Sequence, residues 1–343
     1  MSNADNNGIH PYTLIPLPAD APFELREATE GKGWGAFATR RIQQGELILS
    51  ERPMFVIRST RAYPGSRHLD RAFRDLDPAT KALVGLAREN GGPEFTSASQ
   101  CFIQNSFNVS DTELGFYLVQ SRFNHSCQPN STVPFTAYAD TALAPVRRYA
   151  LVDIEVGEEI TFCYQDDIVN KVKDERHRLL HFECRCNCCM QNFAASRKSD
   201  MRRDLMAALT YMNHGVLPNG QIDDSDEPLV ANRALKKQAE DRTMPITTQL
   251  VHQLWHVVVA EEEGIVAGMI HELASNIHYL ARSLKTKRNI EIAELALEQE
   301  TFADMFLTAS RFLGEPDEGD DKLNRDVAEM RAIRIAQYLE NNS

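Results

Sequence analysis

The sequence predicts an α+β protein: a β-rich first part with a helical insert, followed by an all-α second part. Short stretches of alternating apolar and polar residues, at 23–26, 45–51 and 160–162, are separated by glycine turns and predict strands. After residue 189 the chain becomes rich in Ala and Leu at helical spacing, which predicts amphipathic helices. The length of 343 residues also favours two domains over a single core.

We divide the chain into a flexible N-terminal lead at residues 1–20, a β-rich domain at 21–190 and a helical domain at 195–343. The lead is polar and contains three prolines. The helical insert of the β-rich domain spans about residues 59–118, with helical spacing from residue 66 onward and Asp77-Pro78 as a helix start. In the last domain we expect helices at 252–263, 267–284, 290–312 and 323–339, whose similar lengths suggest a helical-repeat array.

The net charge of −12 is concentrated in the second part of the chain. Residues 200–343 carry 25 acidic and 15 basic side chains, so the first 199 residues are nearly neutral. Phosphate contacts need Lys and Arg, so this charge disfavours a nucleic-acid binder. A basic peptide or protein is the easier partner, although the acidic charge also serves solubility alone.

Targeting signals are absent from the sequence as it stands. No run of about 18 apolar residues occurs, so we expect no membrane partner. Residues 1–8 are polar and lack the apolar centre of a signal peptide. We therefore expect a cytoplasmic and/or nuclear protein, and a monomer.

Four of the seven cysteines lie within six residues, which favours a metal site over disulfides. The spacing Cys184-x-Cys186-x-x-Cys189 offers three thiolates, and structural zinc takes four ligands. The best fourth ligand is Cys127, because it lies in a second polar cluster at residues 122–130.

Other ligand sets stay open. Spacing alone allows Cys188 to replace Cys189, and His181 lies close to the thiolates in sequence. His125 is a further alternative beside Cys127. Cys101 and Cys163 are read as small buried residues.

Three stretches carry a resemblance to a known family. They are Gly-Lys-Gly-Trp-Gly at 31–35, Arg-Phe-Asn-His-Ser-Cys-Gln-Pro-Asn at 122–130 and Gly-Glu-Glu-Ile-Thr-Phe-Cys-Tyr at 157–164, followed by the cysteine tail. In order and spacing they resemble the SET-domain protein lysine methyltransferases. The resemblance covers about residues 22–190. The two longer motifs are specific, whereas a glycine loop alone is weak.

The resemblance implies a SET fold of small β-sheets closed by a knot-like threading near the two central motifs. It also implies S-adenosylmethionine as cofactor, and a zinc-bound post-SET tail at about 182–190 that completes the cofactor pocket. Glycines suit such a site, because a ligand can approach their backbone closely. The cofactor-binding residues that it implies are Lys32, Gly33, Trp34, Asn124, His125, Tyr164 and Phe182.

Tyr164 occupies the family's catalytic tyrosine position. Methyl transfer to lysine requires a neutral amine, whose ordinary pKa is about 10.4, so an apolar channel that excludes water is expected. The tyrosine hydroxyl would orient the amine rather than act as a strong base. Phe162 and Tyr117 are candidate channel residues, as is Tyr149, although the tyrosines also read as ordinary core aromatics. By resemblance, Phe162 favours more than one methyl addition.

The all-α part resembles the tetratricopeptide-like tail of the MYND-type subfamily. The MYND zinc finger itself is missing, since residues 59–115 contain only Cys101, and the arrangement is similar to fungal SET proteins. The leading hypothesis is a protein-lysine N-methyltransferase that acts on a histone or non-histone lysine in a basic context. The alternative is a non-catalytic SET-fold scaffold whose helical domain binds a partner protein.

Overall fold

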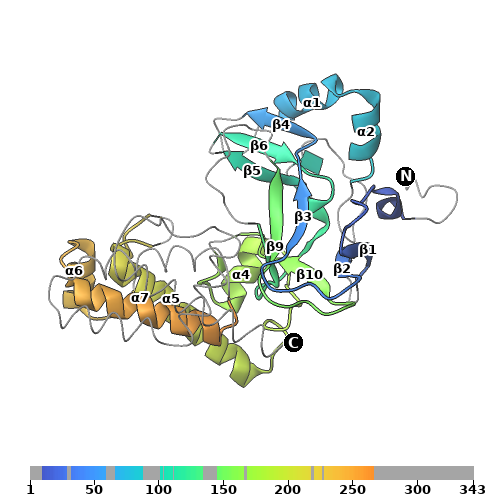
Figure 1. Ribbon diagram of the computed structural model, residues 1–343. Helices are drawn as coiled ribbons and strands as arrows, with labels where there is room; N and C mark the ends of the chain where they lie inside the picture. Colours follow the sequence, from blue (N-terminus) through green and yellow to red (C-terminus); the bar gives the residue numbers. More distant parts are fainter. Residues whose placement is uncertain are drawn as a thin grey trace, which may run out of the picture. The chain divides into compact units, whose positions relative to one another are not determined.

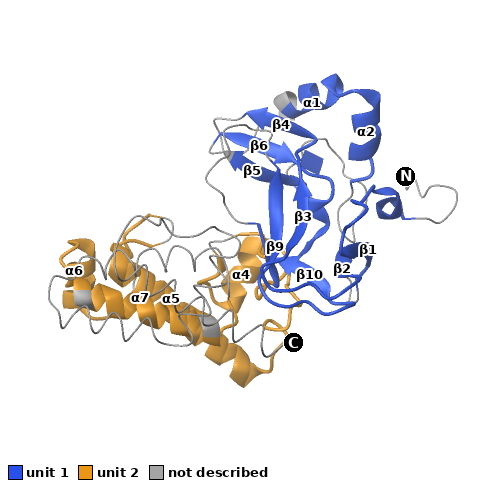
Figure 2. Ribbon diagram, viewed as in Figure 1, with its two compact units in different colours: residues 1–125, 130–162 blue, residues 126–129, 163–343 orange. Residues whose placement is uncertain are grey.

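The computed structural model describes residues 10–28, 32–58, 66–87, 101–102, 104–110, 112–133, 145–165, 168–217, 220–225 and 228–265. The chain forms two compact units (Figure 2). Unit 1 comprises Met1–His125 and Asn130–Phe162, and unit 2 comprises Ser126–Pro129 and Cys163–Ser343. The four-residue segment Ser126–Pro129 therefore belongs to unit 2, although its sequence neighbours on both sides belong to unit 1.

Unit 1 contains a four-stranded sheet with the order β1-β2-β10-β7 (Figure 1). Its strands are Phe23–Glu27, Trp34–Ala38, Glu159–Phe162 and Asn124–His125, in that order. β7 and β10 run parallel, and they pair Asn124 with Thr161 and His125 with Phe162. The central motif and the Gly-Glu-Glu motif are thereby brought side by side, about 35 residues apart in sequence.

Two three-stranded sheets complete the β structure of the described part of unit 1. One has the order β3-β9-β8, with strands Leu47–Glu51, Val146–Ala150 and Ser131–Thr132. The other has the order β4-β6-β5, with strands Phe55–Arg58, Glu113–Phe116 and Ser106–Ser110. These short sheets confirm the predicted β-rich first part.

The expected helical insert is only partly helical. α1 (Ser66–Asp75) and α2 (Pro78–Val84) lie within it, and the Asp77 carboxylate caps α2 by accepting from Ala79 N and Thr80 N. The prediction of helix is wrong at 106–116, which form β5 and β6. Phe107 and Val109 alternate with polar residues, so this stretch has the period of two that suits a strand.

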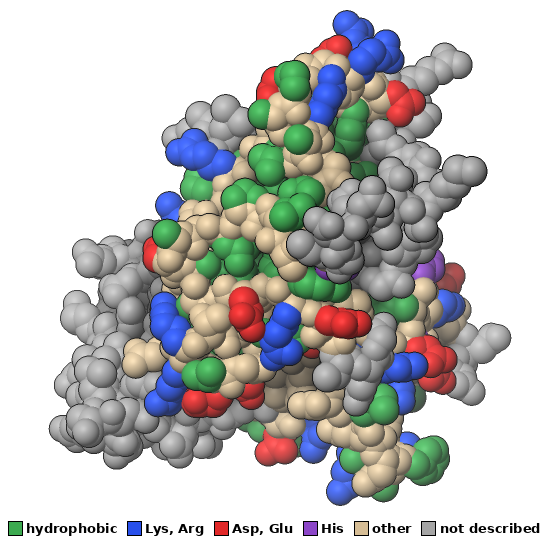
Figure 3. Space-filling model, turned by 90° about the vertical axis from the view of Figure 1, so that its right-hand side faces the viewer, with side chains coloured by type: hydrophobic (Ala, Val, Ile, Leu, Met, Phe, Trp, Pro, Cys, Tyr) green, Lys and Arg blue, Asp and Glu red, His purple; other side chains and the backbone are tan. Residues whose placement is uncertain are grey.

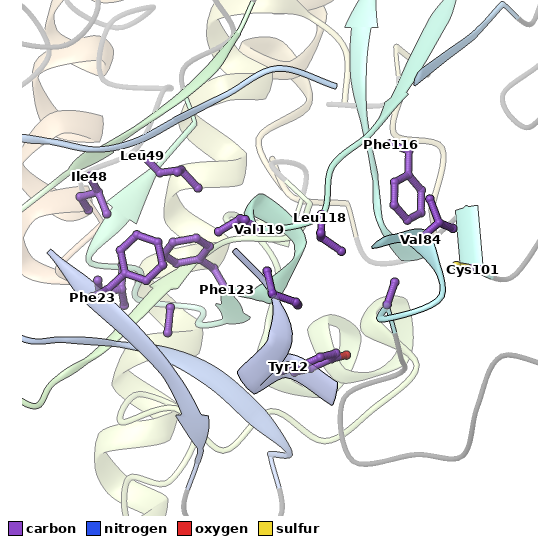
Figure 4. Close-up of a cluster of buried hydrophobic side chains, with 14 of the residues drawn as sticks. Tyr12, Phe23, Ile48, Leu49, Val84, Cys101, Phe116, Leu118, Val119 and Phe123 are labelled. Atoms are coloured by element: carbon purple, nitrogen blue, oxygen red, sulfur yellow. The ribbon is translucent and has the colours of Figure 1, made fainter. Parts of the chain in front are cut away.

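One hydrophobic core runs through unit 1 (Figure 4). Phe23 and Phe123 meet edge to face at 5.1 Å, and Phe55 stacks on Phe116 at 5.2 Å. Part of the stretch expected to be a flexible lead contributes to this core. Residues Pro11–Leu14 form a short 3-10 helix, η1, whose Tyr12 is buried with the core residues.

The described part of unit 2 is largely helical after residue 192, in agreement with the predicted change to helix after Cys189, and a helix that was not predicted, α4 (Lys173–Leu180), precedes the cysteine tail. Unit 2 also contains α5 (Phe193–His214), α6 (Arg233–Glu240) and α7 (Ile246–Glu262), and α5 packs against both α6 and α7. Asn192 caps the start of α5, and Gly215 ends it in the left-handed conformation at φ 71°. The helix expected at 252–263 is present within α7. The helices expected at 267–284, 290–312 and 323–339 lie outside the described residues.

Charged side chains of both signs are interspersed on the face shown in Figure 3, rather than gathered by sign over its described part. Among the described helices, none combines the length and the apolar character that a bilayer crossing requires.

The core contacts predict a large effect of truncating Phe116. Its ring is fully buried among Phe55, Phe73 and Phe102. Phe116→Ala should lower the free energy of unfolding by about 3–5 kcal/mol, because it removes apolar contacts and leaves a cavity. Denaturant-induced unfolding checks this value. Val156→Ala, at a side chain that is 64% exposed, serves as the control and should change stability by less than about 0.5 kcal/mol.

Candidate functional site

The described residues of the glycine stretch, 32–35, lead into and begin β2, which pairs antiparallel with β1. Gly33 has φ 73°, a left-handed conformation that favours glycine, and its carbonyl accepts from Ala28 N at 2.7 Å. Trp34 follows at the start of β2, and its ring stacks on the His10 ring with centroids 4.1 Å apart. The indole of Trp34 is therefore packed against the segment before β1.

Asn124 is held by two acceptors in unit 1. Its Nδ2 donates to Trp34 O at 3.2 Å and to Glu159 Oε1 at 2.7 Å. These two contacts fix the orientation of the Asn124 amide.

Glu159 is the residue around which the predicted site residues of unit 1 gather. Besides Asn124, its carboxylate pairs with Lys32 Nζ at 3.4 Å. A Cβ at Gly35 would lie 2.7 Å from Glu159 Oε1 and 2.8 Å from Asn124 Nδ2, so a larger residue there would displace one of these two side chains. Sequence reasoning assigned Glu159 no role. The available signal was its place at the first position of β10, two residues before the pairing with Asn124.

Asn130, the last residue of the central motif, docks onto the backbone of β10. Its Nδ2 donates to Glu159 O at 2.9 Å, and its Oδ1 accepts from Thr161 N at 2.8 Å. Ser131 Oγ donates to Thr161 O at 2.8 Å. These bonds fix β10 beside β7, where His125 is buried and paired with Phe162.

An aromatic row lies next to this strand pair. The Phe162 ring stacks on Phe107 with centroids 5.8 Å apart, and Phe107 meets Tyr117 edge to face at 5.5 Å. The buried Arg148 guanidinium lies over Phe162 at 4.2 Å. The structure thus brings the two predicted channel residues Phe162 and Tyr117 into one row through Phe107, while Tyr149 lies half-buried in β9.

Tyr117 is the polar member of the aromatic row. Its hydroxyl is buried and has no hydrogen-bond partner in the structure. Burial raises the pKa of Tyr117, and the charge of Glu51 adds to the shift. A buried hydroxyl of this kind is costly unless a ligand pairs with it, which suits a residue at a binding channel.

In unit 2, Tyr164 and Phe182 lie close together, with ring centroids 6.4 Å apart and a T-shaped arrangement. Both side chains are 43% exposed. The predicted catalytic tyrosine and the predicted adenine-covering ring thus share one surface of this unit, where an external molecule can reach them.

The cysteine cluster also lies in unit 2. The Sγ atoms of Cys127, Cys186, Cys188 and Cys189 all lie within 4.8 Å of one another, and all four residues are buried. A zinc ion with Zn–S bonds of about 2.3 Å places its sulfurs about 3.8 Å apart. The Sγ–Sγ separations are 3.6 Å for Cys127–Cys189, 3.8 Å for Cys186–Cys188 and 4.0 Å for Cys188–Cys189. The cluster is therefore compatible with zinc.

Cys184 is buried in the same apolar cluster, and its Sγ lies within 4.8 Å of Cys127 Sγ. Together, Cys127 and the four tail cysteines supply one thiol more than a tetrahedral site uses. Thiol hydrogen bonds, that of Cys127 first, lower the pKa of Cys186 well below its usual range. His181 ends α4 in the left-handed conformation at φ 59° and lies outside the cysteine group.

Comparison with known proteins shows similarity over part of the chain. Residues 33–165 match the family model of the SET domain. The histone-lysine N-methyltransferase set5 of Schizosaccharomyces pombe is 29% identical over 201 residues, which are 57% of this chain and 56% of that protein. Human histone-lysine N-methyltransferase SMYD3 is 38% identical over 96 residues, 25% of this chain and 21% of that protein. A SET and MYND domain-containing protein of Dictyostelium discoideum is 32% identical over 99 residues, 27% of each chain. The chain thus spans about half or less of the length of these relatives.

The cysteine geometry predicts the metal content of the protein. Purified wild-type protein should hold about one zinc ion per chain, and Cys186→Ser should hold close to none, because a hydroxyl replaces one of the clustered thiolates. Atomic emission measures the ratio. Cys101→Ala, at a buried cysteine of unit 1, is the matched control and should keep the metal. Equal zinc content in Cys186→Ser and wild type would show that the cysteine cluster is not the metal site.

Proposed function

The chain carries a SET domain and is related to the fungal SET5 and SMYD proteins, and we propose that it is an S-adenosylmethionine-dependent protein-lysine N-methyltransferase. The reaction moves a methyl group from the sulfonium of the cofactor to the ε-amine of a lysine in a protein substrate. One observation carries the proposal most strongly. Glu159 accepts from Asn124 Nδ2 and pairs with Lys32, and Asn124 also donates to Trp34 O, so three of the predicted cofactor residues share one set of contacts.

The residues of unit 1 suit the amino-acid end of the cofactor. The α-ammonium group of S-adenosylmethionine is a donor, and the oriented Asn124 carbonyl is the matching acceptor. The turn at Gly33 lets a ligand approach the backbone of Lys32 to Trp34. We assign the adenine to the His125 backbone and the Phe182 ring, as the family resemblance implies. When bound, the cofactor supplies the activated methyl group.

The chain's own residues would then prepare the amine. The aromatic row of Phe107, Tyr117 and Phe162 offers an apolar wall, and desolvation lowers the pKa of a lysine amine toward its neutral, nucleophilic form. The Tyr164 hydroxyl would accept or donate a hydrogen bond that aligns the amine with the methyl group. Phe162 carries no hydroxyl to hold a water in the way, and we assign it a preference for more than one methyl addition.

A structural zinc ion would serve the same site indirectly. Cys127 belongs to the central motif, and the other clustered cysteines belong to the tail that follows Phe182. A metal bound by both segments would fix the short tail, which has little core of its own. We keep Cys127, Cys184, Cys186 and Cys189 as the proposed ligands, with Cys188 as the alternative thiolate.

The substrate class follows from the relatives and from charge. Two of the relatives above are named histone-lysine N-methyltransferases. The net charge of −12 of this chain favours a lysine in a basic segment. We propose a histone or another basic protein as substrate; a histone substrate would make the protein at least partly nuclear.

Glu159 generates a prediction for cofactor binding. Glu159→Gln should weaken S-adenosylmethionine binding about tenfold, because an amide cannot accept from both Asn124 Nδ2 and Lys32 Nζ and no longer fixes the asparagine. Calorimetric titration of zinc-loaded protein measures the Kd. Glu158→Gln is the control, since the Glu158 carboxylate only accepts from Glu155 N in its own turn. If both variants bind like wild type, Glu159 has no part in the cofactor site.

Tyr164 generates the test of the reaction itself. Tyr164→Phe should lower kcat about 100-fold through lost alignment of the amine, while S-adenosylmethionine binding changes less than about twofold. Transfer of labelled methyl to core histones, followed by mass spectrometry of lysines, gives the rate and the number of methyl groups. Normal turnover of Tyr164→Phe would rule out its catalytic role. Wild-type protein that binds no S-adenosylmethionine would favour the scaffold alternative instead.

A further inference from the structure

We propose that Arg203 of α5 and Arg176 of α4 are positioning residues of the metal centre, so that the helices of unit 2 control how tightly the metal is held. This inference rests on the proposed zinc site. It concerns two side chains that the SET motifs do not include, because Arg176 and Arg203 both follow the matched residues 33–165.

Arg203 is the more central of the pair. Its residue exposure is 0%, and its guanidinium donates in three directions. Nη2 donates to Cys127 O at 3.2 Å and lies 3.9 Å from Cys188 Sγ. Nη1 donates to Val169 O at 2.6 Å, and Nε pairs with Glu263 Oε1 at 3.0 Å. One buried side chain thus connects the Cys127 backbone, a tail thiol and the end of α7.

Arg176 contacts the tail cysteines from α4. It is 1% exposed, and its Nη2 lies 3.6 Å from Cys189 Sγ and 3.8 Å from Cys188 Sγ. Its Nη1 donates to Lys171 O at 2.6 Å and lies 3.9 Å from Asp200 Oδ1. Both arginines therefore direct N–H groups at sulfur, the contact that stabilises a thiolate over a thiol.

The segment Ser126–Pro129 has a second link to the helices. Gln128 Nε2 donates to Glu263 O at 2.6 Å. Gly264, at φ 66°, comes next, and a Cβ there would lie 2.5 Å from Gln128 Nε2. Glu263 thus binds Arg203 through its carboxylate and Gln128 through its carbonyl. The end of α7 holds the Cys127 segment at two points.

Charge explains why two arginines are buried here. A zinc ion with four thiolates has a formal charge of −2, and buried charge is costly unless it is compensated. Arg176 and Arg203 together bring +2. The buried Glu263 carboxylate has an additional cation in Arg202, whose Nη1 lies 3.4 Å from Oε2. With Arg202 and the carboxylates of Glu263 and Asp200 included, the named side chains carry a net +1, which has the sign that an anionic metal–thiolate centre needs.

The test is the rate of zinc release from the full-length protein to a chromogenic chelator. Arg203→Met should release zinc at least about tenfold faster than wild type, since residues that support metal ligands typically affect affinity 10- to 100-fold. Arg202→Met is the matched control. Arg202 is a helix neighbour, 34% exposed on its side chain, and binds Glu263 and Glu262 without a recorded bond to the cysteines or their segment. It should stay within about twofold of wild type.

A second variant separates metal retention from folding. Arg203→Met alone leaves the buried Glu263 carboxylate without its closest cation, which by itself destabilises the protein. Arg203→Met combined with Glu263→Gln removes both charges, and it should still release zinc at least about tenfold faster. Release at the wild-type rate from this double variant would overturn the inference while leaving the proposed zinc site intact. Wild-type protein without zinc would overturn the zinc site and this inference together, whereas S-adenosylmethionine binding and methyl transfer are measured independently.

Discussion

The site in unit 1 depends on the side-chain amide of Asn130, which makes hydrogen bonds to β10 of the kind that a neighbouring strand would make. β7 has only two residues, and a parallel ladder of that length is weak. Asn130 adds the missing bonds, since its amide donates to Glu159 O and accepts from Thr161 N on the β10 backbone. These bonds fix the position of β10, and with it the position of the Glu159 carboxylate. Glu159 in turn orients Asn124, so the proposed cofactor site depends on the Asn130 bonds.

Buried polar side chains also hold strands and loops together by hydrogen bonds elsewhere in unit 1. The Glu51 carboxylate accepts from three successive backbone N–H groups, those of residues 118–120, at 2.9, 3.0 and 2.6 Å. Arg148 lies between the rings of Phe123 and Phe162 and donates to Gln120 Oε1 and Ser131 Oγ. Strands of two to five residues cannot satisfy all the backbone groups around them, so side chains fill the remaining positions. The rigidity of the site therefore comes from specific polar contacts as much as from apolar burial.

Motif spacing predicted the cysteine cluster better than it predicted the elements between the motifs. Cys127 was expected beside the tail cysteines because structural zinc takes four ligands, and it lies with Cys186, Cys188 and Cys189. Glu159 was not predicted as a site residue. A single acidic residue in a turn followed by a strand is usually exposed to solvent, and only the fold shows which strand lies beside it. Strands β5 and β6 were not predicted, because apolar and polar residues alternate over only about five positions there and the preceding sequence has helical spacing. No sequence pattern indicated a role for Arg203, because a single arginine is common in a helix that is rich in charged residues.

The packing of η1 has a practical bearing on where this domain begins. Tyr12 lies under the Arg122 guanidinium at 4.5 Å, and His10 lies flat against Trp34 beside the glycine turn. A fragment cut at residue 21, just ahead of the first strand, would keep every motif. It would nevertheless remove two aromatic contacts, one with Arg122 of the central motif and one with Trp34 of β2. A fragment that keeps the packing of unit 1 therefore has to include residue 10.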